Sequence, residues 1–487
     1  MEILNQKIKD YKYLNEFLIE TPSHFLINKG ITGCGGTTLE LESKRNSIIL
    51  CPTINLVKSK SSLGYFGVYG DVSKEQIKNY IFSESSYKKI IATYDSLKKL
   101  MESISNYSEY FLLIDEYHLL FNDYSLRTDA IMFLLQNFKK FKNWAFLTAT
   151  PLKQEFILKE LKDVNQINYI WEKAVPVKMN IRDTYYVQKE LVNVIEMYKD
   201  RNLHIFLNSV NTIKSIIDKL CVDDYRVICS KNSKSKITKY AEITDPVKKL
   251  NFYTSCSFEG TDIYDPNGYC IILCDTNISS TVLDIATKVR QICGRLRDSI
   301  YKDECCLILN TNKHRYAGTS RKEFESIVAD SEKRGKKKSL EYESKDEDDM
   351  ITECKLYSKE TYSSLYLSKY NNKIFYDENL KKLDIYNYNL ISEIYNNSIS
   401  VLTECSENNI NPVVIKTDKG LEWIKQELIK LDKYTFTYEE LKNIFEPLFI
   451  EHGLKWNIKN SIKNYFPDFK KKVKKKNGIK HIYYYFK

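Results

Sequence analysis

Two adjacent carboxylates, Asp115 and Glu116, directly follow the apolar run Tyr110–Ile114. An uninterrupted apolar run is typical of a buried parallel strand, and open α/β sheets carry their reactive groups at the carboxyl ends of such strands. At that edge one carboxylate can hold Mg²⁺ while the other orients and deprotonates a water molecule for attack on a phosphoryl group. An ordinary charged loop after a strand would explain the pair equally well, so the chemistry depends on what accompanies it.

A glycine-rich loop is the first accompanying feature. The segment Gly30–Thr38 contains four glycines and lies between an apolar strand, His24–Lys29, and a helix expected from Leu39. A loop in this position points several backbone N–H groups at one spot, near the positive end of the helix dipole, and so cradles phosphates. Two further polar segments follow downstream: Thr148–Thr150, at the end of the strand Trp144–Leu147, and Gln291–Arg297.

In this order the segments resemble the superfamily 2 helicases and translocases of the DEAD/DEAH type, over roughly residues 20–310. The stronger matches are the loop Gly30–Thr38, the box Asp115–His118, and the segments Thr148–Thr150 and Gln291–Arg297. The weaker matches are Ile48–Thr53, Ile90–Leu97 and Thr254–Asp262. Several ordered matches are far more specific than one alone, and their structural context tests them.

The resemblance implies ATP and Mg²⁺ as cofactors and assigns roles by position. Thr37 and Asp115 would hold Mg²⁺, Glu116 would activate the attacking water, and Arg295 and Arg297 would stabilise the developing charge. The ATP-binding positions would be Gly30, Gly33, Cys34, Gly35, Gly36, Thr37, Thr38, Asp262 and Gln291. Coupling of the ATP cleft to the nucleic-acid face would fall to His118, Thr148 and Thr150, and contacts with nucleic acid to Thr53, Thr93 and Thr254.

One departure from the family concerns Gly36, which stands where the family has a lysine that reaches the β- and γ-phosphates. Loss of such a preorganised cation costs on the order of several kcal/mol of transition-state stabilisation. Three explanations stay open: Lys29, the nearest cation in sequence, substitutes for it; the arginines of the second lobe supply enough charge; or the chain binds nucleotide without useful turnover. The intact carboxylates and arginines favour a working ATPase.

The elements that must position these groups alternate along the chain. Apolar strands separated by helical stretches predict a parallel sheet covered on both faces over residues 23–155. Its strands are expected at 25–28, 47–51, 89–92, 110–114 and 144–148. A second lobe over 175–315 is expected to hold strands at 204–207, 225–229, 252–254, 269–274 and 305–309, and a helix over Val282–Arg290. The fold class is therefore α/β with two tandem RecA-like lobes, and ATP would lie in the cleft between them.

Three other segments carry weaker patterns. Residues 1–22 are expected to form a helical lead-in, because apolar residues recur there at near-helical spacing. Residues 325–350 carry dense charge of both signs without an apolar period, which predicts an exposed linker or loop. Residues 351–415 are rich in Tyr and Asn, and their pattern indicates no role.

The C-terminal segment, 418–487, predicts an α+β domain that resembles a winged helix. Its expected elements are a helix over 421–431, a capping box at Thr437–Glu440, a basic helix over Trp456–Tyr465 and a hairpin that turns at Asn477-Gly478. In a winged helix the third helix enters a DNA groove and the hairpin lies along phosphates. The lysines expected to contact DNA are Lys455, Lys459, Lys463, Lys471, Lys474 and Lys476.

The charge distribution agrees with a nucleic-acid partner. The chain has a net charge of +10, and residues 451–487 alone hold eleven lysines and two acidic residues. A basic tip on an otherwise balanced protein is an electrostatic footprint for a polyanion. The alternative is a small structural domain whose lysine-rich edge strand prevents aggregation.

The length and composition of the chain restrict the classes of protein to which it could belong. A chain of 487 residues is too long for one core and suits several domains. It has neither an apolar run of about 18 residues nor a signal-peptide pattern, so we expect no membrane partner and a cytoplasmic location. The twelve cysteines contain no CxxC pair, which gives no basis for a zinc site. Heavy Lys, Asn, Ile and Tyr usage suggests an AT-rich phage or mobile-element genome.

These inferences lead to one functional hypothesis and one rival. The hypothesis is a nucleic-acid-dependent ATPase of helicase or translocase type that acts on DNA rather than RNA, in replication or recombination. The rival is a DNA-binding replication initiator or loader whose helicase-like scaffold is catalytically weak or inactive, which the missing loop lysine favours.

Overall fold

The structure is a computed structural model that describes residues 2–230, 233, 237–311, 319–358, 362–415, 417, 431, 435–451, 470–476 and 479–485. Two compact units can be distinguished by their contacts: 1–183 with 187–415, and 184–186 with 416–487. The larger unit holds two parallel sheets and a mainly helical segment, and the smaller unit holds one antiparallel sheet. Among the described residues, no helix combines the length and apolar character needed to cross a bilayer.

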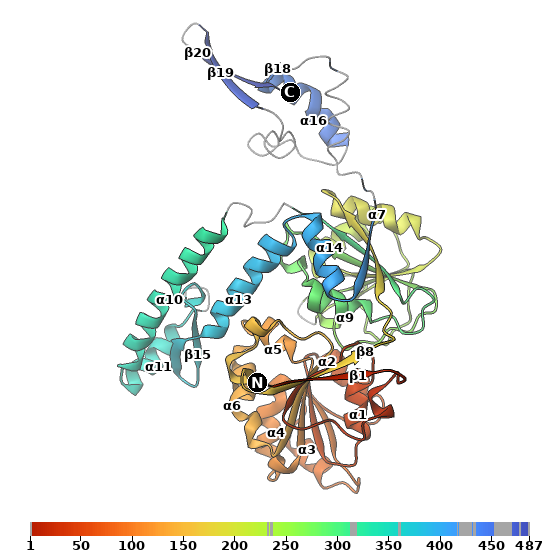
Figure 1. Ribbon diagram of the computed structural model, residues 1–487, viewed down its shortest axis with the longest axis vertical. Coiled ribbons are helices and arrows are strands. Elements are labelled where there is room, and N and C mark those ends of the chain that lie inside the picture. The colour runs from red at the N-terminus through yellow and green to blue at the C-terminus, as the bar shows by residue number, and fades with distance from the viewer. Residues whose placement is uncertain are drawn as a thin grey trace. The chain divides into compact units, whose positions relative to one another are not determined.

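The first lobe is built on an eight-stranded sheet in which every neighbouring pair is parallel. In spatial order its strands are β1 (Ile3–Ile8), β8 (Asn165–Trp171), β2 (Phe25–Asn28), β7 (Asn143–Thr148), β6 (Phe111–Asp115), β3 (Ser47–Cys51), β5 (Lys89–Thr93) and β4 (Phe66–Val68). The helices of this lobe are α1 (Gly36–Glu42), α2 (Ile54–Ser61), α3 (Lys74–Ile81), α4 (Leu97–Ser103), α5 (His118–Asn122) and α6 (Thr128–Asn137) (Figure 1).

Alternation along the central strands explains why helices cover both faces of this sheet. Ile48 and Leu50 of β3 pack into a core with residues of α3, α4 and α6, whereas Ile49 and Cys51 pack into a second core with residues of α1 and α2. Successive side chains of a strand point to opposite faces, so a strand apolar at every position has to be buried on both sides. The continuous apolar runs in the sequence therefore became central strands.

The topology gathers the motif ends at one edge of the sheet. The strand β7 lies between β2 and β6, and the register pairs Asn28 with Thr148 and Asp115 with Leu147. The glycine loop, the carboxylates and the Thr148–Thr150 segment consequently leave three neighbouring strands at their carboxyl ends. Parallel sheets place their functional groups at this edge.

The predicted helical lead-in over 1–22 is wrong. Ile3–Ile8 forms the edge strand β1, which pairs in parallel with β8, and a 3₁₀ turn, η1 (Leu14–Glu16), follows. Five of the six β1 residues are exposed, so the strand is held by its backbone ladder rather than by burial. Its partner lies about 160 residues away in the chain, and the local spacing of apolar residues carries no information on such pairing.

The second lobe is built on a seven-stranded sheet, again parallel throughout. In spatial order its strands are β11 (Tyr225–Ile228), β12 (Leu250–Tyr253), β10 (Asn202–Phe206), β13 (Gly268–Cys274), β14 (Glu304–Leu309), β9 (Val177–Asp183) and β17 (Ile410–Val414). One face is covered by α7 (Val187–Met197) and α8 (Val210–Leu220). The α/β fold class with two tandem parallel-sheet lobes is therefore confirmed.

The helix expected over Val282–Arg290 differs in its geometry. A π-helical turn, η10 (Ile285–Val289), leads into a short α-helix, α9 (Arg290–Cys293). Asp284 caps the turn, because its carboxylate accepts hydrogen bonds from the backbone N–H of Ala286 and the hydroxyl of Thr287. Wide turns of this kind occur often at functional sites.

The predicted charged linker over 325–350 is also wrong, because a 23-residue helix, α10 (Arg321–Glu343), occupies most of it, followed by α11 (Glu347–Leu356). A narrow buried stripe of mostly small side chains runs along it: Phe324, Val328, Ser331, Gly335, Ser339 and Tyr342. These positions recur every three or four residues, which is the helical period. The dense charge forms ion pairs four residues apart, such as Glu332 with Lys336, that stabilise an exposed helical face.

The Tyr- and Asn-rich segment 351–415 joins α10 to the second sheet. It contains the hairpin β15 (Leu367–Tyr370) and β16 (Lys373–Tyr376), the helix α13 (Glu378–Asn389), a π-helical turn η11 (Leu390–Ile394) and the helix α14 (Ser398–Glu407). Figure 1 shows α10 and α13 side by side, and the rings of Phe324 and Tyr388 stack there at 3.9 Å. The segment ends in β17, which extends the second sheet alongside β9.

The smaller unit contains β18 (Thr435–Thr437), α16 (Tyr438–Glu451), β19 (Lys470–Lys476) and β20 (Ile479–Tyr485). The sheet order is β18-β20-β19, antiparallel. The capping box is present, since the Thr437 hydroxyl accepts from Glu440 N–H and the Glu440 carboxylate accepts from Thr437 N–H. The basic helix over Trp456–Tyr465, with Lys455, Lys459 and Lys463, lies outside the described residues, as does most of the helix over 421–431. The winged-helix interpretation therefore stays a prediction.

Replacement of Gly335 by Ala tests the small-residue stripe of α10. A Cβ at this position would meet the backbone carbonyl of Leu365 and would lie 3.3 Å from a ring carbon of Tyr376. Although Gly→Ala normally favours a helix by about 1 kcal/mol, we expect Gly335→Ala to lower the free energy of unfolding by about 1–3 kcal/mol through overpacking. Chemical denaturation would measure it, with the exposed Lys337→Ala in the same helix as control; a more stable Gly335→Ala protein would contradict the packing.

Candidate functional site

A cavity of about 660 Å³ brings most of the predicted site residues together. Residues from the glycine loop, from the end of β6 and from the segment after α9 line it. The predicted positions among them are Gly33, Cys34, Gly35, Gly36, Thr37, Thr38, Asp115, Glu116, Asp262, Arg295 and Arg297. Both lobes therefore contribute to one cavity.

The acidic pair lies at the end of β6 and is held by its neighbours. The Thr37 hydroxyl donates to Asp115 Oδ2 at 2.6 Å, and the buried Tyr94 hydroxyl donates to the Asp115 carbonyl at 2.5 Å. Glu116 adopts φ 52°, in the left-handed region that non-glycine residues rarely occupy. Such backbone costs on the order of 1–3 kcal/mol and collects at functional sites.

Lys29 is the main cation beside these carboxylates, and the predicted site set lacked it. Its Nζ lies 2.9 Å from Glu116 Oε1 and 3.7 Å from Asp115 Oδ1, and its side chain is only 7% exposed. Burial lowers the pKa of Lys29, but the two carboxylates outweigh burial and hold that pKa above its usual value. Burial also raises the pKa of Asp115, which Lys29 only partly offsets. The ammonium is therefore protonated and buried between two carboxylates.

Gln291 links the acidic pair to the second lobe. Its side-chain Nε2 donates to Glu116 Oε2 at 2.8 Å and to Thr150 Oγ1 at 3.2 Å. The buried Arg295 donates in turn to Gln291 Oε1 at 3.0 Å and to the Gln291 carbonyl at 2.8 Å. A continuous polar chain therefore runs from Lys29 through Glu116 and Gln291 to Arg295.

Arg297 and its neighbours fit closely against the glycine loop. Arg297 Nε donates to Asp262 at 2.5 Å, and a Cβ on Gly33 would collide with the Arg297 guanidinium. A Cβ on Gly294 would likewise collide with Thr32. Asp262, expected among the ATP-binding residues, is thus the ion-pair partner of Arg297. The two glycines permit an approach between the lobes that side chains would block.

A second bridge between the lobes was not foreseen from the sequence. Arg290, directly before Gln291, donates to the Gly30 carbonyl at 2.7 Å. Gly30 has φ +79°, and a Cβ there would collide with the Tyr169 carbonyl, so this position needs glycine. Gly30 contributes its backbone to the lobe interface. A sequence signal for Arg290 is its place within the arginine-bearing segment.

The expected coupling residues lie directly behind Glu116. His118 Nδ1 lies 2.9 Å from Thr148 Oγ1, and Thr148 donates to Glu116 Oε2 at 3.0 Å. Thr150 receives the hydrogen bond from Gln291. Burial lowers the pKa of His118 to about 3, so the ring is neutral near pH 7. These three residues connect the ends of α5 and β7 to the cavity through hydrogen bonds.

Of the loop residues, Cys34 has the side chain least suited to take part in chemistry at the cavity. Its side chain packs into the core beneath the loop, and its thiol donates to the Ile31 carbonyl at 3.3 Å. Burial raises the pKa of Cys34 to about 11. Cysteine reactivity requires thiolate, so this thiol is inert at neutral pH. Only the backbone of Cys34 is placed to serve the cavity.

Three of the residues expected to contact nucleic acid, Thr53, Thr93 and Thr254, are not among those that line this cavity. Thr53 caps α2, where its hydroxyl accepts from the Leu56 N–H. The hydroxyls of Thr93 and Thr254 are buried against Ser96 and the Ile228 carbonyl. Thr53 and Thr254 follow the carboxyl ends of β3 and β12, and Thr93 is the last residue of β5. Lys471, Lys474 and Lys476 belong to β19 of the smaller unit.

The donor set at the cavity fits Mg²⁺. Mg²⁺ prefers hard oxygen ligands, and in phosphoryl-transfer sites it takes one or two protein ligands together with phosphates and water. The Thr37 hydroxyl and the Asp115 carboxylate are two such oxygens, already in contact. No group of three or more His, Cys, Asp or Glu side chains in the described part of the chain is arranged to hold a metal ion by itself.

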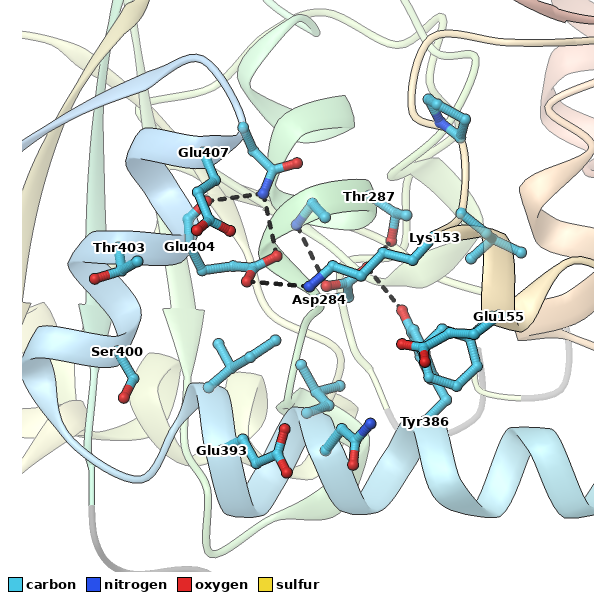
Figure 2. Close-up of a pocket in the computed structure, with 18 of the residues that line it drawn as sticks. Lys153, Glu155, Asp284, Thr287, Tyr386, Glu393, Ser400, Thr403, Glu404 and Glu407 are labelled. Carbon is cyan, nitrogen blue, oxygen red and sulfur yellow. Dashed lines mark hydrogen bonds and ion pairs between the residues drawn. The ribbon is translucent and has the colours of Figure 1, made fainter. Parts of the chain in front are cut away.

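A second cavity, of about 420 Å³, adjoins the segment that carries Gln291 (Figure 2). Figure 2 shows Lys153 pointing toward Glu404, with which it forms a 3.6 Å ion pair. Tyr386 of α13 donates to Asp284, the cap of η10, at 2.7 Å. Helices α13 and α14 therefore support the π-helical turn from behind, a role that the sequence of 351–415 does not indicate.

Known proteins offer limited similarity. No family description matches the chain, and no curated protein matches its sequence. The Mycobacterium smegmatis helicase Lhr bound to ssDNA and AMP-PNP aligns at 12% identity and a TM-score of 0.43, over 61% of this chain and 44% of that one. The S. cerevisiae protein Dbp5 bound to RNA and ADP BeF3 aligns at 13% identity and a TM-score of 0.42, over 63% of this chain and 82% of that one. Similarity this low assigns no activity to the chain.

Glu259, in the Thr254–Asp262 segment, has a buried carboxylate whose effect on stability should depend on pH. Its Oε1 lacks a hydrogen-bond partner among the described residues. Burial raises the pKa of Glu259 to about 7, above the ordinary value of 4.5. The folded state therefore favours the protonated form, and stability is lost as pH rises from about 4.5 to about 7.

We expect Glu259→Gln to remove this pH dependence. Above pH 7 the wild type carries a buried charge at a cost of about 3 kcal/mol, which the neutral amide avoids, whereas near pH 4.5 the two proteins should be equally stable. Urea unfolding at pH 5 and pH 8 would measure the difference, with the exposed Glu75→Gln as control. A Glu259→Gln protein no more stable than wild type at pH 8 would contradict the burial of this carboxylate.

Proposed function

We propose that the chain is a nucleic-acid-dependent ATPase of helicase or translocase type that acts on DNA. The observation that carries the proposal is the hydrogen bond from Gln291 to Glu116. It joins the lobe that holds the glycine loop to the lobe that holds the arginines, and its acceptor, Glu116, lines the cavity to which both lobes contribute. A triphosphate bound there would meet a phosphate cradle, two carboxylates and two guanidinium groups at once.

The proposed reaction is hydrolysis of the γ-phosphoryl bond. Glu116 accepts a proton from water, and the water oxygen bonds to the γ-phosphorus as the bond to the β,γ-bridging oxygen breaks, leaving ADP and inorganic phosphate. Arg295 and Arg297 stabilise the charge that develops on the phosphoryl oxygens. Thr37 and Asp115 would hold Mg²⁺, which neutralises charge on the β- and γ-phosphates when bound.

The hydrogen-bond chain behind Glu116 gives hydrolysis a route to the rest of the molecule. Thr148 contacts Glu116 and His118, and Gln291 contacts Glu116 and Thr150. Loss of the γ-phosphate would change the partners of Glu116, and those contacts would pass the change to both lobes. Relative motion of such lobes along a strand is the mechanical basis of translocation.

The choice of DNA rests on the lysine-rich C-terminal segment. A basic strand, β19, pairs with β20 in an antiparallel hairpin, as the winged-helix interpretation expects. A module of this kind would anchor the ATPase to duplex DNA, in replication or recombination, in a phage or mobile element. The rival function is an initiator or loader with a catalytically inactive scaffold. The absence of a lysine at position 36 favours this rival function, but the cavity retains the cation Lys29 and both arginines.

ATP hydrolysis with and without DNA tests the proposed activity. We expect the wild type to hydrolyse ATP, single- or double-stranded DNA to stimulate it, and Glu116→Gln to lower kcat by about 100-fold or more, because the amide cannot accept the proton. Phosphate release at saturating ATP would measure the rates, with RNA as a competing activator. Equal rates for wild type and Glu116→Gln, without stimulation, would favour the inactive scaffold.

The basic hairpin predicts a change in salt dependence. Replacement of Lys471, Lys474 and Lys476 by Ala in the full chain should reduce the slope of log K against log salt by up to about 3 for duplex DNA, because each phosphate contact releases about one counterion. Fluorescence anisotropy over a salt series would measure the slope.

The control replaces three exposed lysines of the larger unit, Lys140, Lys199 and Lys337, by Ala. It makes the same change in net charge without touching the hairpin. If both triple variants shift the slope equally, net charge rather than the hairpin governs DNA affinity, and the proposed anchor is wrong.

A further inference from the structure

Any side chain at position 36 would have to displace a buried neighbour. A Cβ built on Gly36 would lie 2.7 Å from Leu147 Cδ2 and 3.4 Å from Lys29 Cδ. Leu147 belongs to the buried strand β7, so the first contact is tighter than real Cβ atoms tolerate. The stem of Lys29 already fills the neighbouring space. The glycine and the lysine therefore form a matched pair.

Lys29 is rigidly anchored at its backbone. Its N–H donates to the Thr148 carbonyl at 2.8 Å, which continues the ladder between β2 and β7. Its carbonyl accepts from the Ile31 N–H at 2.9 Å and from Trp171 Nε1 at 2.7 Å. The side chain leaves this fixed point, passes Gly36 and ends beside Glu116 within the cavity. An ammonium group on a rigid strand end is thereby delivered to the interior of the loop.

The charges around Lys29 leave it available to a phosphate. Its Nζ has one close partner, Glu116 Oε1, and lies 3.7 Å from Asp115. An ammonium carries three donors, so contact with Glu116 uses only part of its capacity. Both carboxylates also have other hydrogen-bond donors, Gln291 for Glu116 and Thr37 for Asp115. The ammonium can therefore contact phosphoryl oxygens while the carboxylates remain satisfied.

We infer that Lys29 is the phosphate-binding cation of this site and takes the place of a loop lysine at position 36. The inference rests on the proposed ATPase function. With nucleotide bound, Lys29 donates to non-bridging oxygens of the β- and γ-phosphates from the side of β2. It reaches them from the strand before the loop, whereas a lysine at position 36 would reach them from the helix after it. Without nucleotide, the same ammonium neutralises Glu116.

A purely structural role for Lys29 makes different predictions. If Lys29 only neutralised buried carboxylates, its loss would lower stability and would weaken the binding of every nucleotide alike. If it binds phosphate, its loss weakens nucleotides that carry β- and γ-phosphates and leaves AMP nearly unaffected. The affinity ratio between AMP-PNP and AMP therefore separates the two roles.

The test uses the full chain with Mg²⁺ and compares wild type, Lys29→Ala and the exposed control Lys44→Ala. We expect Lys29→Ala to lower kcat/KM for ATP by about 100-fold or more, a loss typical of removing one preorganised transition-state donor. AMP-PNP affinity, measured by titration calorimetry, should fall at least tenfold, while AMP affinity, measured by competition, should change less than twofold. Lys44→Ala should match wild type in all three readouts.

A relocated lysine provides the second variant. Lys29→Ala/Gly36→Lys removes the Lys29 stem from beside position 36, and a lysine from the loop enters that space when the Leu147 methyl group shifts to admit its Cβ. We expect this protein to recover at least tenfold of the lost AMP-PNP affinity and kcat/KM, whereas Gly36→Lys alone should be less stable than wild type. Thermal unfolding of each variant checks the fold, and the double variant carries the test if Lys29→Ala does not fold.

Three results would overturn the inference. If wild type is active and Lys29→Ala keeps its kcat/KM and AMP-PNP affinity, Lys29 is dispensable while the ATPase function stands. If Lys29→Ala weakens AMP-PNP and AMP equally and the relocated lysine recovers nothing, Lys29 is a structural counter-ion. If wild type neither binds AMP-PNP nor differs from Glu116→Gln, the ATPase function fails and the inference fails with it.

Discussion

The buried ion pair between Lys29 and Glu116 is the interaction on which the arrangement of this protein depends. Two carboxylates at the end of one buried strand are costly unless cations and donors compensate them. Lys29 supplies the charge from the first lobe, and Gln291 supplies a hydrogen bond from the second. The ion pair therefore sets the position of Glu116, and Glu116 sets the contact between the lobes.

This constraint explains features that would otherwise be unrelated. Glu116 combines a left-handed backbone with side-chain contacts to both Lys29 and Gln291. Gly33 and Gly294 lack side chains where the lobes meet, and Gly36 leaves room for the Lys29 stem. The turn that carries Gln291 is in turn held by Tyr386 of α13. The accessory helices thus belong to the same mechanical unit as the cavity.

The sequence predicted the parts of the fold that depend on patterns within short stretches of the chain. Strands such as Ser47–Cys51 are continuous apolar runs, and the ordered motifs placed Asp115, Glu116, Gln291 and Arg295 in one cleft. The sequence did not predict β1, β4, β8, β9 or β17. Of these, β1 and β17 are edge strands whose partners lie far away in the chain. Helix α10 was not predicted because a stripe of small buried residues gives only a weak periodic pattern of hydrophobicity in the sequence.

The role of Lys29 could not be established from the sequence alone, for a different reason. Its nearness to the loop made it one candidate among three, but only three-dimensional packing shows that its stem fills the space beside Gly36. Arg290 and Tyr94 were missed because each acts on a backbone carbonyl, a contact without a sequence pattern. Sequence motifs therefore indicate which residues come together in the site, whereas the packing shows which residue takes the place of a missing motif residue.

The central claim is that both lobes grip one triphosphate around Glu116. A crystal structure of the full chain with Mg²⁺ and AMP-PNP tests it most directly. The account predicts the γ-phosphate within hydrogen-bonding distance of Lys29 and of Arg295 or Arg297, with the β-phosphate in the Gly33–Thr37 loop. A nucleotide held by one lobe alone, or bound away from Glu116, would contradict it.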